Sequence, residues 1–536
     1  MCRKGSNFPL APLIDFSEAV APELRGLGDL HFEITTNSEE AQAFFDQGMR
    51  LVYAFNHEEA YRAFQEATRL DRSCAMAYWG MALALGPNIN DALPDLPRQK
   101  MAVMAINKAI AHSASATDVE RSLIEAYRQR CTKEEVDQDL LNIAYAEAMK
   151  SCYERFAQHV EVNVLYAASI MNTMPWDYYE ADMSPKERTK EILQVLDHVV
   201  AEFPDHPGGH HYFIHLIEAA EPERALPSAD RLSDLMPGAG HIVHMPSHIY
   251  IGLGMYDRAA EVNRLAISAD EEYIAQCQVQ GLYHMAYYPH NIHFLWAATS
   301  MLGNSQEAID AAEKVALRVP TDQAAEVHFI QDFMSVPLQA YVRFGRWNDI
   351  LSTPSPDTSL LHTSMMWHYA RGIALSHKGR YESAHLELQA VRELASDPRS
   401  ESIYAAYTNP TSAVGAVAVE ALAGELAAEQ GQYEDAIAHL KRAVEFEENL
   451  AYQEPSAWHY PMRHSLGAVL LEAGKVAEAE QVYRIDLEKN KGNGWSLFGL
   501  YQSLLAQSRY QEAKVIEDAF LKSWEYADIA ITSSRF

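Results

Sequence analysis

The sequence predicts an all-α protein in which one helical hairpin is repeated along the chain, and three observations support this prediction. First, a glycine and an alanine recur with one fixed spacing, at Gly48 and Ala60, Gly372 and Ala384, Gly424 and Ala436, and Gly467 and Ala479. Second, the alanine ends a similar turn sequence in HKGRYESA, EQGQYEDA, EAGKVAEA, GLGMYDRA and AQSRYQEA. Third, Ala225 and Ala259 are separated by 34 residues, and so are Ala479 and Ala513. A fixed period of this length is typical of helical solenoids, in which small residues let two helices approach closely.

Interruptions of the repeat set the expected organisation of the chain. The prediction is an irregular N-terminal arm over 1–35, helical repeats with insertions over 36–200, central histidine-rich repeats over 201–330 and C-terminal repeats over 331–536. The two main insertions are PNINDALPDLP (87–97) and MPWDYYEADMSP (174–185), and both contain residues that end helices. Insertions in a solenoid project from one edge, so we expect them to cover or line the groove.

The composition of the 536-residue chain narrows the classes of function. Apolar residues make up 48% and charged residues 22%, as in a folded globular protein. The net charge of −31 repels phosphates, so we expect no nucleic-acid partner and no membrane partner. The five cysteines contain no C-x-x-C pair, which argues against disulfides and thiolate zinc sites. Met1 to Phe16 has no apolar segment of the kind that directs secretion, so we expect a cytoplasmic protein.

Histidines are concentrated in one part of the chain. Ten of the 23 lie between His206 and His293, mostly within GHHYFIHLIEA, GHIVHMPSHIY and YYPHNIHFLW. On a helix, residues three or four apart share a face. Within the three motifs, pairs with this spacing include His211 and His215, His244 and His248, and His290 and His293. Pro246 is expected to kink the helix within the second pair, whereas His206, His210 and His284 flank these helices.

The repeat resembles that of the tetratricopeptide-repeat (TPR) superfamily. In AQAFFDQGMRLVYAFNHEEAYRAFQEATRLDR (41–72), Gly48, Ala60, Phe64 and Ala67 stand where a TPR places its small residues and its aromatic residue. The segments GMRLVYAFNHEEAYRAF, AMAYWGMALALGPNIN, HIVHMPSHIYIGLGMYD, YYPHNIHFLW and NGWSLFGLYQSL are similar to those of a long bacterial-type TPR family of unassigned chemistry. The resemblance implies a superhelical solenoid of helical hairpins.

The resemblance also implies which histidines face the groove of the solenoid. In this superfamily, positions 2, 5 and 9 of the first helix of a repeat line the concave surface. With the alanine of the turn counted as position 20, the histidines at these positions are His241 and His290 at 2, His244 and His293 at 5, and His248 at 9. The pair His211 and His215 takes positions 6 and 10 of the preceding repeat. We therefore expect imidazoles to converge from three consecutive helices.

Converging imidazoles at matched positions predict a bound transition metal. Neighbouring helices lie about 8–10 Å apart and metal–nitrogen bonds are about 2.0–2.1 Å long, so side chains of adjacent helices can reach one ion. The predicted ligands are His211, His215, His244, His248, His290 and His293, with His241 and Glu218 as further candidates. Ligation by imidazoles favours copper, with iron or zinc as alternatives. A single histidine in a groove is more often a packing residue, but packing gives no reason for six at matched positions.

The function predicted from these features is that of a metal-dependent, oxygen-using oxidoreductase acting on a small organic substrate. No catalytic side chain and no organic cofactor is predicted, because the sequence has no nucleotide-binding glycine loop, G-x-S-x-G or H-E-x-x-H. One alternative is a TPR scaffold that binds a peptide or partner protein in its groove. A second alternative is a zinc-dependent hydrolase, in which the metal lowers the pKa of bound water.

Overall fold

The computed structural model describes residues 18–132, 136–180, 182–277, 283–405 and 408–536. All regular elements in these ranges are helices, apart from one isolated bridge between Tyr179 and Pro185, and this confirms the predicted all-α class. The chain forms two compact units: unit 1 comprises 1–249 and 265–288, and unit 2 comprises 250–264 and 289–536. The division into four segments stays a prediction, and residues 1–17 of the expected arm lie outside the described residues.

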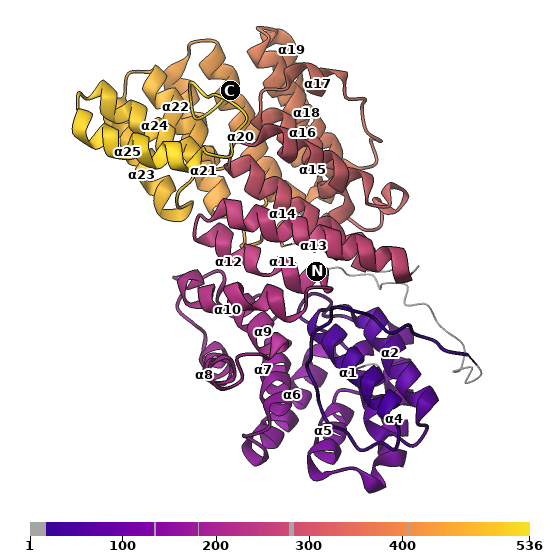
Figure 1. The fold of residues 1–536 in the computed structure, drawn as a ribbon. Helices are drawn as coiled ribbons and strands as arrows, with labels where there is room; N and C mark the ends of the chain where they lie inside the picture. Colours follow the sequence, from indigo (N-terminus) through magenta and orange to yellow (C-terminus); the bar gives the residue numbers. More distant parts are fainter. Residues whose placement is uncertain (1–17, 133–135, 181, 278–282, 406–407) are drawn as a thin grey trace. The chain divides into compact units, whose positions relative to one another are not determined.

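Unit 1 is a series of helical hairpins in which consecutive helices pack against each other (Figure 1). Its helices are α1 (Glu39–Tyr53), α2 (His57–Leu70), α3 (Ala75–Leu85), α4 (Leu96–His112), η1 (Ser113–Ser115), α5 (Asp118–Arg128), α6 (Gln138–Arg155), α7 (Val160–Met171), α8 (Glu187–Glu202), α9 (Pro207–Ile217), α10 (Pro222–Leu235), α11 (Gly240–His244) and the π-helical turn η2 (Tyr283–Tyr287). Helices α12 (Pro246–Gly252) and α13 (Tyr256–Cys277) contribute residues to both units.

Unit 2 continues the same hairpin architecture. Its helices are α14 (Tyr288–Met301), α15 (Ser305–Leu317), η3 (Thr321–Gln323), α16 (Phe329–Arg343), α17 (Trp347–Ser352), α18 (Leu361–His377), α19 (Tyr381–Ala395), η4 (Pro398–Glu401), α20 (Thr411–Glu429), α21 (Tyr433–Glu448), α22 (Met462–Glu472), α23 (Val476–Lys489), α24 (Gly494–Ala506) and α25 (Tyr510–Ser523). The pairs α18 and α19, α20 and α21, α22 and α23, and α24 and α25 each pack as a hairpin.

Glycines on the first helix of a hairpin make room for an aromatic ring on the second helix. In unit 1, a Cβ atom at Gly48 would lie 2.4 Å from the ring of Phe64. In unit 2, a Cβ atom at Gly467 on α22 would lie 2.4 Å from the ring of Tyr483 on α23. Gly499 on α24, in the next hairpin, makes room for the same ring, which a Cβ atom there would approach to 2.1 Å. Side chains do not approach so closely, so only glycine lets these helices meet around a buried ring. This packing confirms the TPR arrangement predicted for the small and aromatic positions.

The described part of the N-terminal arm (18–35) lies along α1. Backbone N–H groups of the arm donate to polar side chains of α1, from Leu24 to Gln47 (2.8 Å), from Phe32 to Asp46 (3.0 Å) and from Ile34 to Gln42 (2.9 Å). Phe45 and Met49 are fully buried on the same helix. The chain itself therefore covers this face of the first hairpin, and it does so through the arm that the sequence predicts to be irregular.

Helix α20 is long and apolar enough to cross a membrane by length and composition, and it is the one such helix among the described residues. Of its apolar window, 72% is buried inside the protein. The helix packs between α18 and α21 in the core of unit 2, so burial accounts for its apolar composition.

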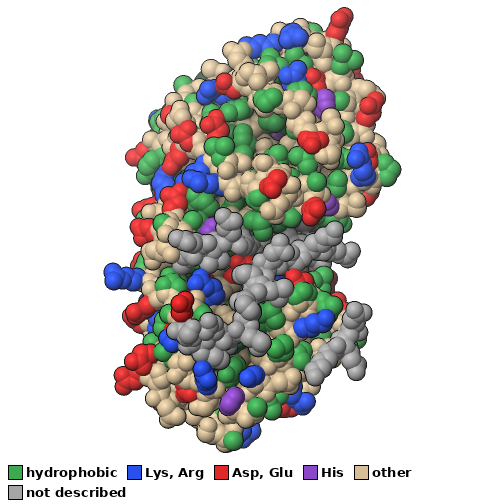
Figure 2. Space-filling model, turned by 90° about the vertical axis from the view of Figure 1, so that its right-hand side faces the viewer, with side chains coloured by type: hydrophobic (Ala, Val, Ile, Leu, Met, Phe, Trp, Pro, Cys, Tyr) green, Lys and Arg blue, Asp and Glu red, His purple; other side chains and the backbone are tan. Residues whose placement is uncertain are grey.

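Acidic and basic side chains are interspersed with apolar ones on the face of the molecule shown in Figure 2. Ion pairs of the surface include Arg224 with Asp197 at 2.7 Å, both exposed, and Arg264 with the half-buried Glu307 at 2.6 Å. Exposed pairs of this kind contribute about 0–1 kcal/mol each to stability. The fold therefore depends on the buried hairpin contacts and not on its surface charges.

Candidate metal centre

Five histidine rings lie next to one another inside unit 1. His211 and His215 lie on α9, His241 and His244 on α11, and His248 on α12. Neighbouring ring centroids are 4.8–6.1 Å apart, and no residue of the five is more than 4% exposed. We call this group the histidine centre. It contains four of the six predicted ligands together with His241, which register predicts only as a further candidate.

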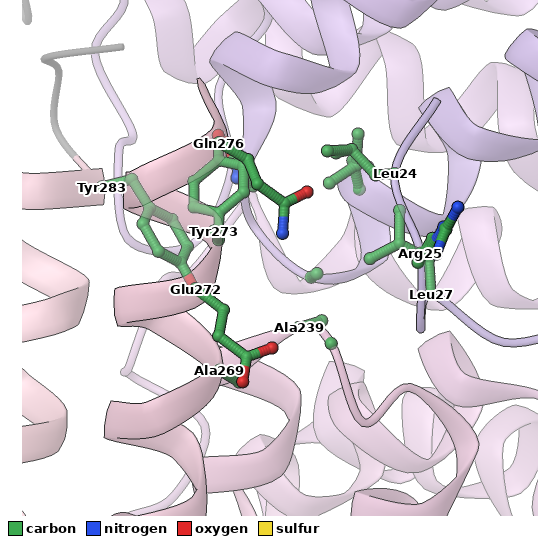
Figure 3. Close-up of a pocket in the computed structure, with 13 residues that line it drawn as sticks. Leu24, Arg25, Leu27, Ala239, Ala269, Glu272, Tyr273, Gln276 and Tyr283 are labelled. Carbon is green, nitrogen blue, oxygen red and sulfur yellow. The ribbon is translucent and has the colours of Figure 1, made fainter. Parts of the chain in front are cut away.

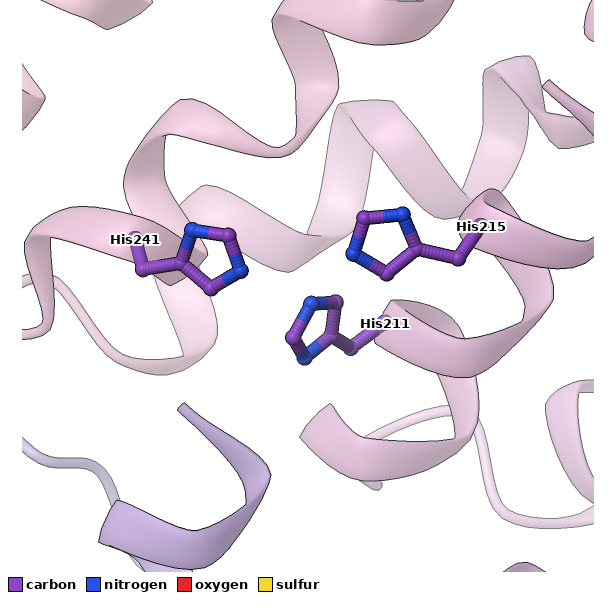
Figure 4. A group of neighbouring side chains, drawn as sticks. All are labelled: His211, His215 and His241. Atoms are coloured by element: carbon purple, nitrogen blue, oxygen red, sulfur yellow. The ribbon is translucent and has the colours of Figure 1, made fainter. Parts of the chain in front are cut away.

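Three of these residues could hold one metal ion. One nitrogen atom each of His211, His215 and His241 can be chosen so that all three lie within 4.8 Å of one another. Figure 4 shows the three rings grouped together, with His211 and His215 extending from one helix and His241 from another. The i, i+4 pair on α9 thus behaves as predicted, and the third nitrogen comes from the first turn of α11.

The local surroundings fix the protonation of His211. Its Nδ1 lies 2.6 Å from the carbonyl oxygen of Tyr53, which can only accept a hydrogen bond, so Nδ1 carries the proton. Nε2 then carries the lone pair, and it has no hydrogen-bond partner among the described residues. Burial, together with the nearby His215, holds the pKa of His211 well below its usual range. His211 is therefore neutral at pH 7 and presents a lone pair to the centre.

Glu218 lies beside two rings of the centre. Its Oε2 is 3.5 Å from Nδ1 of His215 and 3.2 Å from Nδ1 of His248. Burial would raise the pKa of Glu218, but the two histidines lower it to about 2. An ionised carboxylate at this place favours a proton on each Nδ1 and so leaves Nε2 of each ring as the ligating atom. Nε2 of His215 has no hydrogen-bond partner among the described residues.

Pro246 interrupts the helix that carries the remaining histidines. Because proline has no N–H to donate, α11 ends at His244 and α12 begins at Pro246, with Met245 between them. The expected kink is thus found. The Nε2 atoms of His244 and His248 lie 3.0 Å apart, and Ser247 Oγ lies 3.2 Å from Nδ1 of His244.

Phe55 packs among the three rings of the candidate site, and sequence reasoning missed it. Its ring centroid lies 4.4 Å from that of His211, 5.5 Å from that of His241 and 5.9 Å from that of His215. The side chain is 3% exposed, and the backbone has φ +56°, which is unusual for a bulky residue. Five other hairpin turns place glycine with positive φ at this position, at Gly254, Gly303, Gly379, Gly431 and Gly474, and another has the small residue Ser508 at φ +61°. That contrast was the signal available in the sequence.

Both predicted insertions reach the histidine centre. Trp176 in the second insertion packs edge-on against His215, with ring centroids 5.1 Å apart, and its Nε1 donates to the carbonyl of Ile89 in the first insertion at 3.0 Å. Asn90 in the first insertion donates to the hydroxyl of Tyr287 at 3.2 Å. The Tyr287 ring lies 4.8 Å from the ring of His241. The insertions therefore line the centre, as expected from their position in the repeat.

Two flanking histidines have structural roles. His206 caps α9, since its Nδ1 accepts a hydrogen bond from the N–H of Gly209 at 3.0 Å, and its Nε2 lies 3.0 Å from Glu161. His210 lies between the hydroxyl of Ser228 at 2.9 Å and the carbonyl of Pro204 at 2.8 Å. Both nitrogens of each ring are thus engaged, which agrees with their assignment outside the ligand set.

His290 and His293 lie on α14 in unit 2, whereas the five residues of the histidine centre belong to unit 1. His293 stacks on Trp296 with centroids 5.0 Å apart and an interplanar angle of 9°. Burial lowers the pKa of His293 to about 4. The ring of His290 packs edge-on against that of Phe294 at 4.8 Å. Ligation of a metal by these two residues stays a prediction.

A cavity of about 50 Å³ lies in unit 1 between the N-terminal arm and α13. Figure 3 shows Leu24 and Leu27 of the arm facing Tyr273 and Tyr283. The hydroxyl of Tyr283 accepts from the N–H of His241 at 3.2 Å and donates to Asp270 at 2.7 Å, which connects the cavity wall to the centre. A volume of this size holds a few water molecules, because one water needs roughly 10–15 Å³ of such space.

No protein-family model and no curated protein matches the chain. Similar solved structures include a human IFIT1 dimer with m7Gppp-AAAA (12% identity, 91% of this chain and 95% of that chain covered, TM-score 0.34) and yeast Tom70 (13% identity, 91% and 95% covered, TM-score 0.26). The TPR domain of P58(IPK) is similar at 12% identity, with 88% of this chain and 99% of that chain covered and a TM-score of 0.22.

The hairpins of both units, their glycine-to-aromatic packing and the 34-residue spacing are those of a TPR array. Arrays of this kind present extended binding surfaces to other molecules. The chain has the fold of the tetratricopeptide-repeat superfamily.

Proposed function

We propose that the histidine centre of unit 1 binds one transition-metal ion, with His211, His215 and His241 as its ligands. The observation that carries this proposal is the convergence of three buried imidazoles whose ligand atoms lie within 4.8 Å of one another. Two of these atoms, Nε2 of His211 and Nε2 of His215, have no hydrogen-bond partner among the described residues. A buried polar atom without a partner costs roughly 1–3 kcal/mol, and a bound ion would supply that partner.

The donor set fits a metal ion in its chemistry. Ligating imidazoles must be neutral, and the pKa values of His211 and His215 are both lowered, chiefly by burial. A tetrahedral ion with bonds of about 2.0–2.1 Å holds its nitrogens about 3.4 Å apart, so the widest separation would close by about 1.4 Å. Rotations of the three side chains can provide a movement of that size.

The groups around the ligands also favour metal binding. A histidine that binds a metal usually donates its other N–H to a carbonyl or a carboxylate, which fixes the ring and raises its basicity. His211 has the carbonyl of Tyr53 in this role, and the carboxylate of Glu218 lies 3.5 Å from Nδ1 of His215, close enough for an ion pair. We therefore assign Glu218 to orienting the rings, not to ligation.

Copper stays the favoured ion, with iron or zinc as alternatives, because the proposed ligands are all imidazoles. The facing Nε2 atoms of His244 and His248 lie next to the three ligands and offer further nitrogen donors. Two such groups side by side are what a centre with more than one ion would need. The proposal made here requires a single ion.

Catalysis is a separate matter from metal binding. A TPR array fits the alternative of a partner-binding scaffold, because arrays of this kind present extended binding surfaces. A role as an enzyme has to be argued from the site and not from the fold. The oxygen-dependent oxidation of a small molecule and the zinc-dependent hydrolysis both stay predictions. Binding of the ion is the function for which the geometry of unit 1 supplies support.

A metal titration tests the proposal. The protein, produced without an affinity tag and stripped with a chelator, is titrated with Cu²⁺ and Zn²⁺ at about pH 7.5, where the ligands are neutral. We expect one tightly bound equivalent, and a loss of about 100-fold or more in affinity when His211→Ala and His215→Ala are combined. His198→Ala, which removes an exposed histidine of unit 1, is the matched control and should leave affinity unchanged. Equal affinity of the double variant and the parent would overturn the proposal, provided that circular dichroism shows both to be folded.

A further inference from the structure

The last residues of the sequence, 529–536 (IAITSSRF), form no helix and lie against the helices of unit 2. We call them the tail segment. Asp528 directly precedes the tail segment. Its carboxylate accepts hydrogen bonds from the N–H groups of Ser305 (2.7 Å) and Gln306 (2.8 Å) at the start of α15. Trp524 Nε1 then donates to the carbonyl of Ile529 at 3.0 Å. These contacts set the point from which the segment extends.

Polar side chains of unit 2 hold the middle of the tail segment. Gln502 on α24 donates to the carbonyl of Thr532 at 2.8 Å. The hydroxyl of Ser534 donates to the carbonyl of His464 at 2.7 Å and accepts from the hydroxyl of Tyr483, also at 2.7 Å. Ser534 is fully buried. The helices of unit 2 therefore contact the tail segment through its backbone and through one small side chain. Bound peptides are contacted in the same way.

Arg535 makes the most specific contacts of the tail segment. Its guanidinium lies among three carboxylates, Glu425 and Glu429 on α20 and Glu472 on α22, and its side chain is 9% exposed. Nη2 donates to both oxygens of Glu472 at 2.9 Å, and Nη1 donates to Glu425 and, at 3.4 Å, to Glu429. The planar fork of arginine can serve several carboxylates in this way, whereas lysine cannot.

An aromatic ring follows the arginine. The ring of Phe536 packs edge-on against Trp495 with centroids 6.0 Å apart. It also covers Gly345, where a Cβ atom would lie 3.0 Å from the ring. Phe536 itself is 41% exposed, so the ring rests on the surface and is not locked into the core.

The burial pattern of the tail segment indicates a replaceable ligand. Ser534 is its one fully buried residue, while Ala530, Thr532 and Phe536 are exposed. Little apolar surface is therefore removed from water, and the segment is held mainly by hydrogen bonds and by the ion pairs of Arg535. Hydrogen bonds of this kind contribute modestly in water. The ion pairs of Arg535, whose side chain is 9% exposed, are screened by salt less than exposed pairs are. A segment that belonged permanently to the core would bury its apolar side chains.

We infer that the face of unit 2 formed by Glu425, Glu429, Glu472, Tyr483 and Trp495 binds an extended segment of another protein that carries arginine followed by an aromatic residue. The tail segment occupies this face as an intramolecular competitor. Three carboxylates that meet one guanidinium leave an excess of negative charge, which selects a cationic side chain and rejects an acidic one. Attachment to the same chain gives the tail segment a high effective concentration, so a partner binds only when the tail segment is displaced.

The experiment compares the full chain with a variant that ends at Asp528. The probe is a fluorescein-labelled peptide with the sequence of residues 527–536, and binding is followed by fluorescence anisotropy. We expect the shortened chain to bind the peptide and the full chain to bind it about tenfold or more weakly, because its face is occupied. A peptide in which the arginine is replaced by glutamate is the matched control and should lose binding. Affinity should also fall as the salt concentration rises, since the contact depends on ion pairs.

Two results would overturn the inference. One is a shortened chain that keeps its thermal transition but does not bind the peptide. The other is equal binding by the full and shortened chains, which would place the peptide elsewhere. If the shortened chain does not fold, hydrogen exchange of the full chain decides: amides of the tail segment should exchange much faster than those of α24, and equal protection would contradict the inference. None of these results depends on metal binding in unit 1.

Discussion

The rings of Phe55 and His215 are parallel, with an interplanar angle of 3° and centroids 5.9 Å apart. Phe55 holds this position from a turn with φ +56°, where five other hairpin turns have glycine. A bulky residue in the left-handed region costs roughly 1–3 kcal/mol. Phe55 is present despite this strain, and its ring packs against three histidines of the centre. The turn residue is therefore adapted to the centre and not to the turn.

Replacing Phe55 separates the strain of the turn from the packing of the ring. Both Phe55→Ala and Phe55→Gly lose the buried ring, which costs about 3–5 kcal/mol. Glycine also relieves the left-handed backbone, so Phe55→Gly should be about 1 kcal/mol more stable than Phe55→Ala. Urea denaturation of the two variants and the parent measures these differences. Equal stability of the two variants would show that the turn stores no strain.

Glu218→Gln tests whether the carboxylate orients the rings of the centre. The amide keeps the shape of the side chain but lacks the charge that favours protonated Nδ1 atoms on His215 and His248. We expect metal affinity to fall by about 10–100-fold, as for other groups that orient metal ligands. Glu223→Gln, at an exposed position on α10, is the control and should have no effect. If Glu218→Gln retained full metal affinity, the charge of Glu218 would have no role in orienting the rings.

Gly467→Ala tests the packing that forms the hairpins of unit 2. The added methyl group would lie 2.4 Å from the ring of Tyr483, so the helices must separate, at a cost of about 1–3 kcal/mol. The measurement is the free energy of unfolding in urea. Combining Gly467→Ala with Tyr483→Ala should cost less than the sum of the two single changes, because the second change removes the clash. Additive costs would mean that the glycine has another role.

Acid should destabilise the protein partly through His459. The hydroxyl of Tyr369 lies 3.2 Å from Nε2 of His459, and burial, with Arg343 nearby, lowers the pKa of His459 to about 3. The unfolded chain takes up this proton near pH 6.5 and the folded chain does not, so stability present above pH 6.5 is lost as the pH falls toward 3.

The matched variant for this prediction is His459→Gln, which keeps an acceptor for Tyr369 and does not titrate. Between about pH 7.5 and pH 5, it should gain roughly 2 kcal/mol in unfolding free energy relative to the parent. Urea titrations at both values measure the change. An identical pH dependence of the two proteins would mean that the buried ring does not resist protonation.

The hairpin architecture could be predicted from the sequence because it depends on local spacing. The distance from Gly48 to Phe64 is fixed by one hairpin, and the structure places the ring against that glycine. The pairs on α9 and on α11–α12 could be predicted for the same reason, since i and i+4 positions share a helix face. The TPR register also placed the histidine motifs on the first helices of their hairpins.

What could not be predicted depends on contacts between residues far apart in the chain. Nothing in the spacing shows that the carbonyl of Tyr53 would fix the proton of His211, or that Arg535 would reach Glu472. The spacing also does not show that His241, predicted only as a further candidate ligand, meets the histidines of α9 across the centre. Phe55 was overlooked because aromatic residues near a turn are common, and only comparison with the glycines of the other turns distinguishes it.

The most direct measurement is the metal content of the full chain, purified without an affinity tag. Elemental mass spectrometry determines it. The structure predicts about one equivalent of a transition metal per chain after reloading, lost when His211 and His215 are both replaced by alanine and kept in His198→Ala. Less than about 0.2 equivalents of any transition metal after gentle purification and reloading would contradict metal binding by the histidine centre.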